Sequence, residues 1–235
     1  MGNPYFQFKT FCVWHDKCAM KVGTDGVLLG AWAQVDHATT ALDVGTGSGL
    51  IALMLASRSS QIQVTAIDID KDAVNQAADN FEKSSFASRL TVRQEDFGHA
   101  TDKARATYDL IVSNPPFFTE KVLCPDTRRS MARSNTHLPF ELLLENSATL
   151  LNPNGHLSVI IPFSESASFI AEAAAHGLYL YRRCDVRSTE RKPPVRTLLE
   201  LGRHGGDTQT DLLTIHAHGG GLSPEMKQLT EDFYL

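Results

Sequence analysis

One junction constrains the fold of this chain more than any other feature. An apolar strand over residues 40–44 enters a turn with three alternating glycines, Gly45-Thr46-Gly47-Ser48-Gly49, and leaves it as a helix over 49–58. Glycines in such a turn let backbone N–H groups face a ligand at the N-terminus of a helix, where the helix dipole favours negative charge or lone pairs. The junction therefore predicts a nucleotide-type ligand at the edge of an α/β sheet.

The rest of the chain alternates strands and helices before it changes pattern. Strands are predicted over 40–44, 63–68, 89–93, 109–113 and 155–161. Helices are predicted over 49–58, 71–83, 138–151 and 164–176. This alternation is typical of a mostly parallel sheet with helices on both faces. After residue 176, strands over 178–187, 195–203 and 211–217 follow without long helices, which predicts an antiparallel edge.

The length of 235 residues suits one domain over 1–235. Within it we expect an N-terminal hairpin and lid segment in 1–38, a core in 39–217 and a C-terminal tail in 218–235. No apolar run approaches the roughly 20 residues that span a bilayer, and residues 1–9 lack the pattern of a signal peptide, so we expect a cytoplasmic protein without a membrane partner. The four cysteines have no CxxC spacing, so neither a metal site nor a disulfide framework is predicted.

The spacing of the glycine turn favours one class of cofactor. Dinucleotide sites use G-x-G-x-x-G, whereas this turn is G-x-G-x-G with Leu50 where the last glycine would fall. Asp43 stands two residues before the first glycine, where a carboxylate would oppose a pyrophosphate but attract a cation. S-adenosyl-L-methionine carries an ammonium and a sulfonium. We therefore expect it at Asp43, Gly45, Thr46, Gly47 and Gly49, with a dehydrogenase as the alternative.

The next two strand ends carry further candidate ligands for a nucleoside. The second strand ends in Ile67-Asp68-Ile69-Asp70, where Asp68, beside Ile69, is the first choice to accept from the ribose hydroxyls. Asp70 is the second choice, or instead caps the helix that follows. The third strand is followed by Glu95-Asp96-Phe97, where Asp96 can accept from the adenine amine and Phe97 can pack near its ring. As an alternative, Phe97 is a core residue.

A separate stretch, Asn114-Pro115-Pro116-Phe117, follows the strand over 109–113 and suits the group being modified. Prolines have no N–H donors, so this loop offers acceptors. The Asn114 side-chain oxygen and the Pro115 carbonyl match the two hydrogens of an –NH2 group, and they can aim its nitrogen at a methyl donor. Phe117 offers a face on which a flat acceptor can stack. We also predict that Asn114 contacts the cofactor.

These paired motifs resemble those of class I S-adenosylmethionine-dependent methyltransferases that act on exocyclic or amide nitrogens. The resemblance spans about residues 20–203 and implies a Rossmann-like class I methyltransferase fold with a mostly parallel seven-stranded sheet. It leaves the acceptor open, because adenine-N6, guanine-N2 and protein glutamine-N5 enzymes share the motifs. Glutamine-N5 enzymes usually add an N-terminal helical domain, for which about 20 residues leave no room. A non-catalytic nucleotide-binding module is a further alternative.

A closer resemblance is to the bacterial tRNA (adenine-N6) methyltransferases that modify the purine beside the anticodon of valine tRNA. It is carried by the aromatic N-terminus, Lys21-Val22-Gly23-Thr24-Asp25-Gly26, Asn114-Pro115-Pro116-Phe117-Phe118 and the ending Asp232-Phe233-Tyr234-Leu235. The resemblance implies transfer of a methyl group to an adenine N6 in tRNA. It also implies that Lys21, Gly23, Thr24 and Asp25 lie over the methionine end of the cofactor. Alternatively, Thr24 or Asp25 merely caps a helix.

Basic residues suggest where RNA would bind. The net charge is −5, but residues 121–203 hold 11 Lys and Arg against 8 Asp and Glu. Arg128, Arg129 and Arg133 follow the acceptor motif, and Arg191 and Lys192 lie on a predicted hairpin. These side chains can contact phosphates around a flipped base, or form an ordinary solvated surface. We expect tRNA as partner, and neither DNA nor an obligate protein partner.

Overall fold

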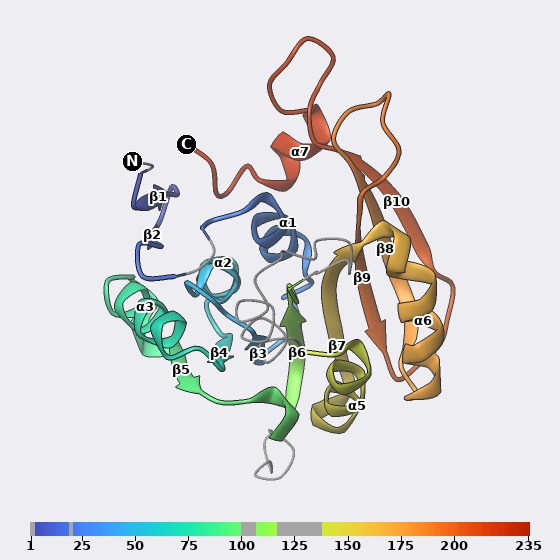
Figure 1. Cartoon of the computed structure of the whole chain (residues 1–235), viewed down its shortest axis with the longest axis horizontal. Helices are drawn as coiled ribbons and strands as arrows, with labels where there is room; N and C mark the ends of the chain where they lie inside the picture. Colours follow the sequence, from blue (N-terminus) through green and yellow to red (C-terminus); the bar gives the residue numbers. More distant parts are fainter. Residues whose placement is uncertain (1–2, 19–20, 100–106, 117–137) are drawn as a thin grey trace, which may run out of the picture.

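The computed structural model describes residues 3–18, 21–99, 107–116 and 138–235, which fold into an α/β structure with one large sheet (Figure 1). The strands of the large sheet are β3 (Thr40–Val44), β4 (Gln63–Asp68), β5 (Leu90–Gln94), β6 (Tyr108–Ser113), β7 (Leu151–Pro162), β8 (Tyr179–Arg187), β9 (Arg196–Gly202) and β10 (Gln209–Thr214). The helices are α1 (Thr24–Trp32), α2 (Leu50–Arg58), α3 (Lys71–Glu82), α5 (Phe140–Leu150), α6 (Ser166–Ala175) and α7 (Pro224–Leu229), with short 3-10 turns at Ala87–Arg89 and Phe163–Glu165.

The strand order is β10-β8-β9-β7-β6-β3-β4-β5, so β3 lies in the middle, between β6 and β4. The strands from β5 through β7 are parallel, as crossovers through helices require. The mostly parallel α/β sheet expected from the sequence is therefore confirmed. The strand predicted over 211–217 is present as β10, so the described sheet has eight strands rather than the seven that the resemblance implies.

The edge beyond β7 also differs in part from the expectation. Only β9 runs antiparallel to its neighbours, β7 and β8. The outermost strand β10 pairs parallel with β8. The chain leaves β9 through residues 203–208 and, instead of turning back along β9, crosses to the far side of β8. This connection gives β10 the direction of β8, so the expected antiparallel edge is confirmed for β7, β9 and β8 and is wrong only for the outermost pair.

Two apolar cores cover the two faces of the sheet, because side chains alternate along each strand. On β3, Ala41 belongs to the core under α1 and α2, whereas Leu42 and Val44 belong to the core under α5 and α6. Figure 1 shows α1 and α2 together on one side of the sheet and α5 with α6 on the other. None of the helices among the described residues is long and apolar enough to cross a membrane.

The N-terminal hairpin packs beside the C-terminal tail, although the two are far apart in sequence. The hairpin pairs β1 (Tyr5–Gln7) with β2 (Cys12–Trp14) in a separate antiparallel sheet, as the sequence predicts. The Lys9 backbone N–H donates to the Phe233 carbonyl at 2.9 Å. The rings of Phe8 and Tyr234 stack with centroids 6.2 Å apart. The two ends of the chain therefore lie close together (Figure 1).

The helix starts agree only in part with the caps predicted from the sequence. Asp70 caps α3 by accepting from the Asp72 N–H, so this alternative for Asp70 is confirmed. Helix α1 instead has Gly23 at its N-cap, without a side-chain hydrogen bond, and Thr24 is its first residue. The expectation that Thr24 or Asp25 caps α1 is therefore wrong.

A buried ion pair joins the antiparallel part of the sheet to α1. Glu200 on β9 is fully buried and accepts from Arg182 on β8 at 2.8 Å. The guanidinium of Arg182 stacks over the Trp32 ring at 3.9 Å and donates to the Trp32 carbonyl at 3.1 Å. Ser158 on β7 donates to the other oxygen of Glu200 at 3.2 Å. These contacts tie the end of α1 to three strands.

The replacement Arg182→Ala should lower the free energy of unfolding by about 3 kcal/mol or more, because it leaves the Glu200 carboxylate buried without its cation. Lys17→Ala removes an exposed ion pair with Asp79, which solvent screens, and should cost far less. The double variant Arg182→Ala/Glu200→Leu should recover part of the loss. Urea unfolding measures all three; equal losses for Arg182→Ala and Lys17→Ala would contradict the role assigned to the buried pair.

Candidate functional site

Four strand ends meet at one edge of the sheet. The register places Val44 of β3 beside both Ile67 of β4 and Ser113 of β6, and Asp68 beside Gln94 of β5. The residues that follow each strand are therefore neighbours: the glycine turn, Ile69, Glu95 and Asn114. Parallel sheets bind ligands at the carboxyl ends of their strands. The motifs that the sequence analysis singled out are thus brought to one place.

The glycine turn adopts a backbone that side chains disfavour. Gly45, Gly47 and Gly49 have φ of 73°, 56° and 81°. A Cβ on Gly45 or Gly47 would meet no atom of the described residues within 4 Å, whereas a Cβ on Gly49 would come within 2.5 Å of the Phe81 ring. Gly49 is therefore needed for packing against α3. Within the described part of the chain, nothing packs against the Cα atoms of Gly45 and Gly47.

Asp43 lies underneath the turn. It is fully buried, and its Oδ2 accepts from the Thr46 hydroxyl at 2.6 Å and from the Ala52 N–H at 3.2 Å. Its Oδ1 is buried without a hydrogen-bond partner among the described residues. Burial raises the pKa of Asp43 to about 7, although the two hydrogen bonds oppose the rise. Asp43 therefore holds the turn to the start of α2, and retains acceptor capacity.

Asp68 holds the turn from the neighbouring strand. Its Oδ2 accepts from the Gly47 N–H and its Oδ1 from the Asp70 N–H, both at 2.9 Å. Burial raises the pKa of Asp68, with these backbone hydrogen bonds opposing the rise. Each carboxylate oxygen can accept a second hydrogen bond, so ribose hydroxyls still have acceptors there. Ile69, next in the chain, is exposed at this edge.

The side chains of the residues that follow β5 lie in different surroundings. Glu95 donates its backbone N–H to the Asp68 carbonyl at 3.0 Å, which joins the β4 and β5 ends. Asp96 is exposed and its Oδ1 accepts from the Gly98 N–H at 2.8 Å. Phe97 is buried in the core on the α5 side, and its carbonyl accepts from the Asn146 side chain at 2.7 Å. Phe97 thus occupies the core position weighed as its alternative, and contact with an adenine stays a prediction.

The acceptor motif begins beside the glycine turn. Ser113 donates through its hydroxyl to the Val44 carbonyl at 3.0 Å, which fixes the end of β6 against the end of β3. Asn114 and Pro116 are half-buried, and Pro115 is buried. The predicted residues Phe117, Arg128, Arg129 and Arg133 lie outside the described residues.

The predicted lid segment contacts the predicted RNA hairpin. Lys21, Gly23 and Thr24 are exposed, and Asp25 is half-buried. The Asp25 Oδ2 accepts from Arg196 Nε at 2.8 Å, so an ion pair joins the start of α1 to the start of β9. The sequence did not predict this pair, because its partners are 171 residues apart.

Arg191 and Lys192 lie in the connection between β8 and β9, and both are exposed. Strand β8 runs in the direction of β6, since β9 is antiparallel to both β8 and β7. The hairpin therefore leaves the sheet at the same edge as Asn114. This placement is compatible with the predicted contact to RNA, which stays a prediction.

Asn80 is a residue that the sequence analysis missed. It is buried on α3, and its side-chain amide donates to the Ser48 carbonyl in the glycine turn at 2.8 Å and to the Trp14 carbonyl at 2.8 Å. Its side-chain oxygen accepts from the Trp14 N–H at 3.0 Å. One amide thus joins α3, the N-terminal hairpin and the turn. In the sequence, the one feature that marks Asn80 is that it is a polar residue on a mostly apolar helix face.

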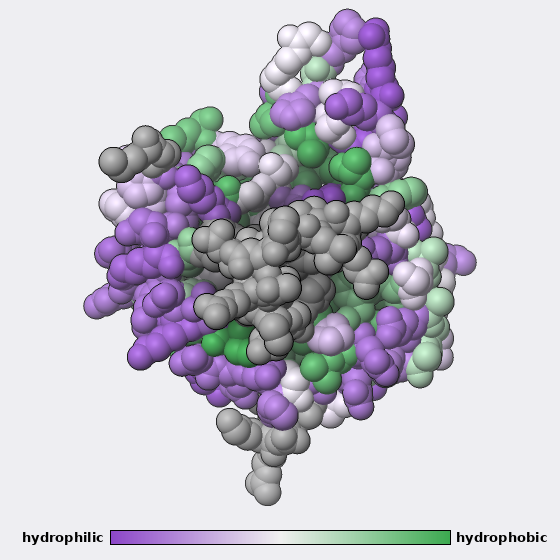
Figure 2. Space-filling model, viewed as in Figure 1, coloured by the Kyte–Doolittle hydropathy of each residue, from purple (hydrophilic) through white to green (hydrophobic). Residues whose placement is uncertain are grey.

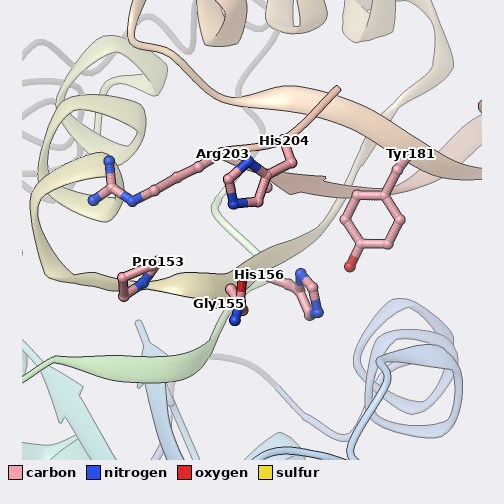
Figure 3. A pocket seen from close by; sticks show the side chains of 8 residues that line it. Pro153, Gly155, His156, Tyr181, Arg203 and His204 are labelled. Carbon is pink, nitrogen blue, oxygen red and sulfur yellow. The ribbon is translucent and has the colours of Figure 1, made fainter. Parts of the chain in front are cut away.

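A small pocket lies at the opposite edge of the sheet (Figure 3). It has a volume of about 160 Å³, and its walls come from the start of β7, from β8 and from the end of β9. The rings of His156 and Tyr181 border it, with centroids 4.9 Å apart. None of the residues predicted to bind cofactor, acceptor or RNA lines this pocket. Across the described ranges, no cluster of three potential metal ligands occurs.

Replacing Asn80 by Ala should weaken binding of S-adenosylmethionine about tenfold, because the Ser48 carbonyl loses the donor that fixes the turn. Gln76→Ala is a matched control. Gln76 is also buried on α3 and accepts from the Lys17 N–H at 2.9 Å, but within the described part of the chain it makes no hydrogen bond to the turn. Both variants should lose stability, and only Asn80→Ala should lose affinity in calorimetric titrations. If both variants lost the same affinity for S-adenosylmethionine, Asn80 would contribute only to the stability of the fold.

The raised pKa of Asp43 predicts a pH dependence of stability in the protein without cofactor. The folded state binds this proton more tightly than the unfolded state, in which the pKa is 3.8, so the stabilisation is present below pH 3.8 and is lost as the pH rises toward about 7. The loss should be on the order of a few kcal/mol. Urea unfolding across this pH range should show that the unfolding free energy of the wild type falls by this amount relative to that of Asp43→Asn as the pH rises. A constant difference would contradict the prediction.

Comparisons with known proteins agree with this arrangement. The family described as "Methyltransferase small domain" matches residues 20–173. A protein of Parabacteroides distasonis named tRNA1(Val) (adenine(37)-N6)-methyltransferase is 47% identical, covering 100% of this chain and 99% of its own length. A protein of the same name from Tolumonas auensis is 42% identical, covering 100% of this chain and 98% of its own.

A solved structure shares the fold at lower sequence identity. The predicted O-methyltransferase Atu636 from Agrobacterium tumefaciens superposes with a TM-score of 0.69, at 20% identity, over 89% of this chain and 96% of its own. At this identity the likeness concerns the fold alone. The family match and the full-length relatives carry the assignment: this chain belongs to the methyltransferase small domain family, together with these bacterial relatives.

Proposed function

We propose that this protein transfers a methyl group from S-adenosylmethionine to the N6 of an adenine in tRNA, at position 37 of a valine tRNA as in the names of its relatives. The observation that carries the proposal is the placement of Asn114 directly beside the glycine turn, through the pairing of β6 with β3. An amide that can accept from an amine would thus border the glycine turn, in which the N–H groups of Gly45, Thr46, Gly47 and Gly49 already donate within the protein. We also propose a cytoplasmic location, supported by the tRNA substrate in the names of the relatives.

The residues at the sheet edge fit S-adenosylmethionine. Among the described residues, none would contact a Cβ on Gly45 or Gly47, and the buried Oδ1 of Asp43 lacks a partner there too. Asp68 would accept from the ribose, Asp96 lies exposed where it can meet the adenine amine, and Lys21 to Asp25 would close over the methionine end. When bound, the cofactor supplies an electrophilic methyl group. A cation near Asp43 would favour its carboxylate form and lower its pKa again.

The acceptor loop orients the nitrogen that is to be methylated. The Asn114 side-chain oxygen and the Pro115 carbonyl would each accept one hydrogen of the N6 amine, which holds the adenine and aims the nitrogen lone pair along the line of attack. Phe117 would provide the stacking face. The nitrogen would become cationic as its lone pair takes the methyl group and the methyl–sulfonium bond breaks, and its proton would then be acidic enough to leave to water. The chain therefore needs to supply acceptors here rather than a strong base.

The two other acceptors receive no specific support. Guanine-N2 and protein glutamine-N5 enzymes share the Asn-Pro-Pro-Phe pattern, but the two full-length relatives described above carry names for the adenine reaction. For RNA contact we propose Arg191 and Lys192, which are exposed at the same sheet edge as Asn114, together with Arg128, Arg129 and Arg133.

The test of the function incubates purified protein and radiolabelled S-adenosylmethionine separately with tRNA, ribosomal RNA and release factor. Nuclease digestion then identifies the labelled nucleoside. We expect label in tRNA alone, as N6-methyladenosine. Label in guanosine or in protein would refute the proposal.

Asn114→Ala should lower kcat by about a hundredfold or more, because it removes an acceptor used to align the amine in the transition state. The dissociation constant for S-adenosylmethionine should change by less than about threefold, since the backbone cradle is untouched. Asn154→Ala, at an exposed position on the opposite sheet edge, serves as the control and should keep full activity. Full activity of Asn114→Ala would show that Asn114 does not take part in catalysis.

A further inference from the structure

Two loops project side by side beyond the carboxyl ends of β8 and β10. One connects β8 to β9 through residues 188–195, and the other connects β10 to α7 through residues 215–223. They are joined at their bases, where the Ile215 N–H donates to the Arg187 carbonyl at 2.9 Å and the His216 N–H to the Ser188 carbonyl at 3.0 Å. Figure 1 shows both loops at the top of the molecule, past the end of the sheet.

The loops are also joined through their side chains. Arg187 donates from Nε to the Thr214 hydroxyl at 2.9 Å. Arg191 Nη2 lies 3.4 Å from His218 Nε2, and because a guanidinium only donates, the histidine nitrogen is the acceptor. The two loops therefore present one continuous surface.

The charge of this surface suits a polyanion. Residues 187–196 contain three arginines and Lys192, with Glu190 as the single acid in that stretch. One of the arginines, Arg196, is paired with Asp25. The second loop carries His216 and His218, and the sequence has no acid between Asp211 and Glu225. In the space-filling view, the projecting loops are coloured mostly purple and white, so their tips are hydrophilic to neutral rather than apolar (Figure 2).

The tip of the second loop exposes backbone. Gly219, Gly220 and Gly221 have φ of 97°, 100° and 77°, and a Cβ on any of them would meet no atom of the described residues within 4 Å. Hydrogen bonds between Ala217 and Gly221 and between Gly220 and Ala217, both 3.2 Å, set the shape of the loop. A backbone without side chains lets N–H groups approach a phosphate closely.

We propose that the loop over 215–223 forms, together with the hairpin over 188–195, a single surface that binds the phosphodiester backbone of the RNA substrate. This inference rests on the proposed function and adds to it a segment that the sequence analysis left as a plain loop. Both loops leave the sheet at the edge where Asn114 lies, since β8 and β10 run in the direction of β6. The Asp25–Arg196 pair connects this surface to the start of α1.

A matched pair of variants tests the proposal. Gly220→Lys and Gly220→Glu impose the same backbone strain at an open position and differ in charge. Gly206→Glu is the control, because Gly206 is exposed with nothing within 4 Å of a Cβ, in the β9–β10 connection at the opposite sheet edge. Binding of unmodified tRNA to the full chain is measured by fluorescence anisotropy over a series of salt concentrations, alongside calorimetric titration with S-adenosylmethionine.

The expected result is about fivefold weaker tRNA binding by Gly220→Glu than by Gly220→Lys at low salt, with the gap closing as salt rises. Gly206→Glu should bind tRNA like wild type, and all variants should bind S-adenosylmethionine alike. Equal tRNA affinities for the two Gly220 variants, whether both unchanged or both reduced, would overturn the inference. If the two Gly220 variants bind tRNA equally but the wild-type protein methylates tRNA, the inference fails and the proposed function stands. If the wild-type protein does not bind tRNA, the inference and the proposed function are both refuted.

Discussion

The site depends on two carboxylates that hold the glycine turn from below and from the side. Asp43 accepts from Thr46 and from the first turn of α2, and Asp68 accepts from Gly47. Both lie at the ends of adjacent parallel strands, so the pairing of β3 with β4 sets their separation. The hydroxyl of Thr46 is the turn's own side-chain contribution, and the three positive φ values fall on glycines, which adopt them without strain.

Parts of the chain outside the sheet support the same turn. Phe81 packs against Gly49, and Asn80 binds Ser48 while it also holds Trp14 of the N-terminal hairpin. The hairpin is in turn packed against the C-terminal tail through Phe8 and Tyr234. Both ends of the chain are therefore joined, through α3, to the loop on which cofactor binding is proposed to depend.

Local patterns predicted most of the elements well, because each reflects forces between near neighbours. The strand over 40–44 and the strand over 63–68 agree with β3 and β4, and Asp70 caps α3. The errors lie where distant contacts decide. Strand β7 begins at Leu151 rather than at 155, since its first residue pairs with Tyr108, and the path of residues 203–208 makes β10 an eighth strand parallel to β8.

The sequence by itself determined the strand, turn and helix of the glycine junction, the class of α/β sheet and the Asn-Pro-Pro-Phe motif on which the proposal of amine methylation rests, because glycine conformation, apolar periodicity and proline chemistry are local properties. Only the tertiary structure decided that Asp43 is buried under the turn, that Phe97 faces the core, that Asn80 bridges the turn to the hairpin and that Asp25 pairs with Arg196. Those facts depend on which strands become neighbours and which side chains lose water, and both are fixed only when segments far apart in the chain pack together.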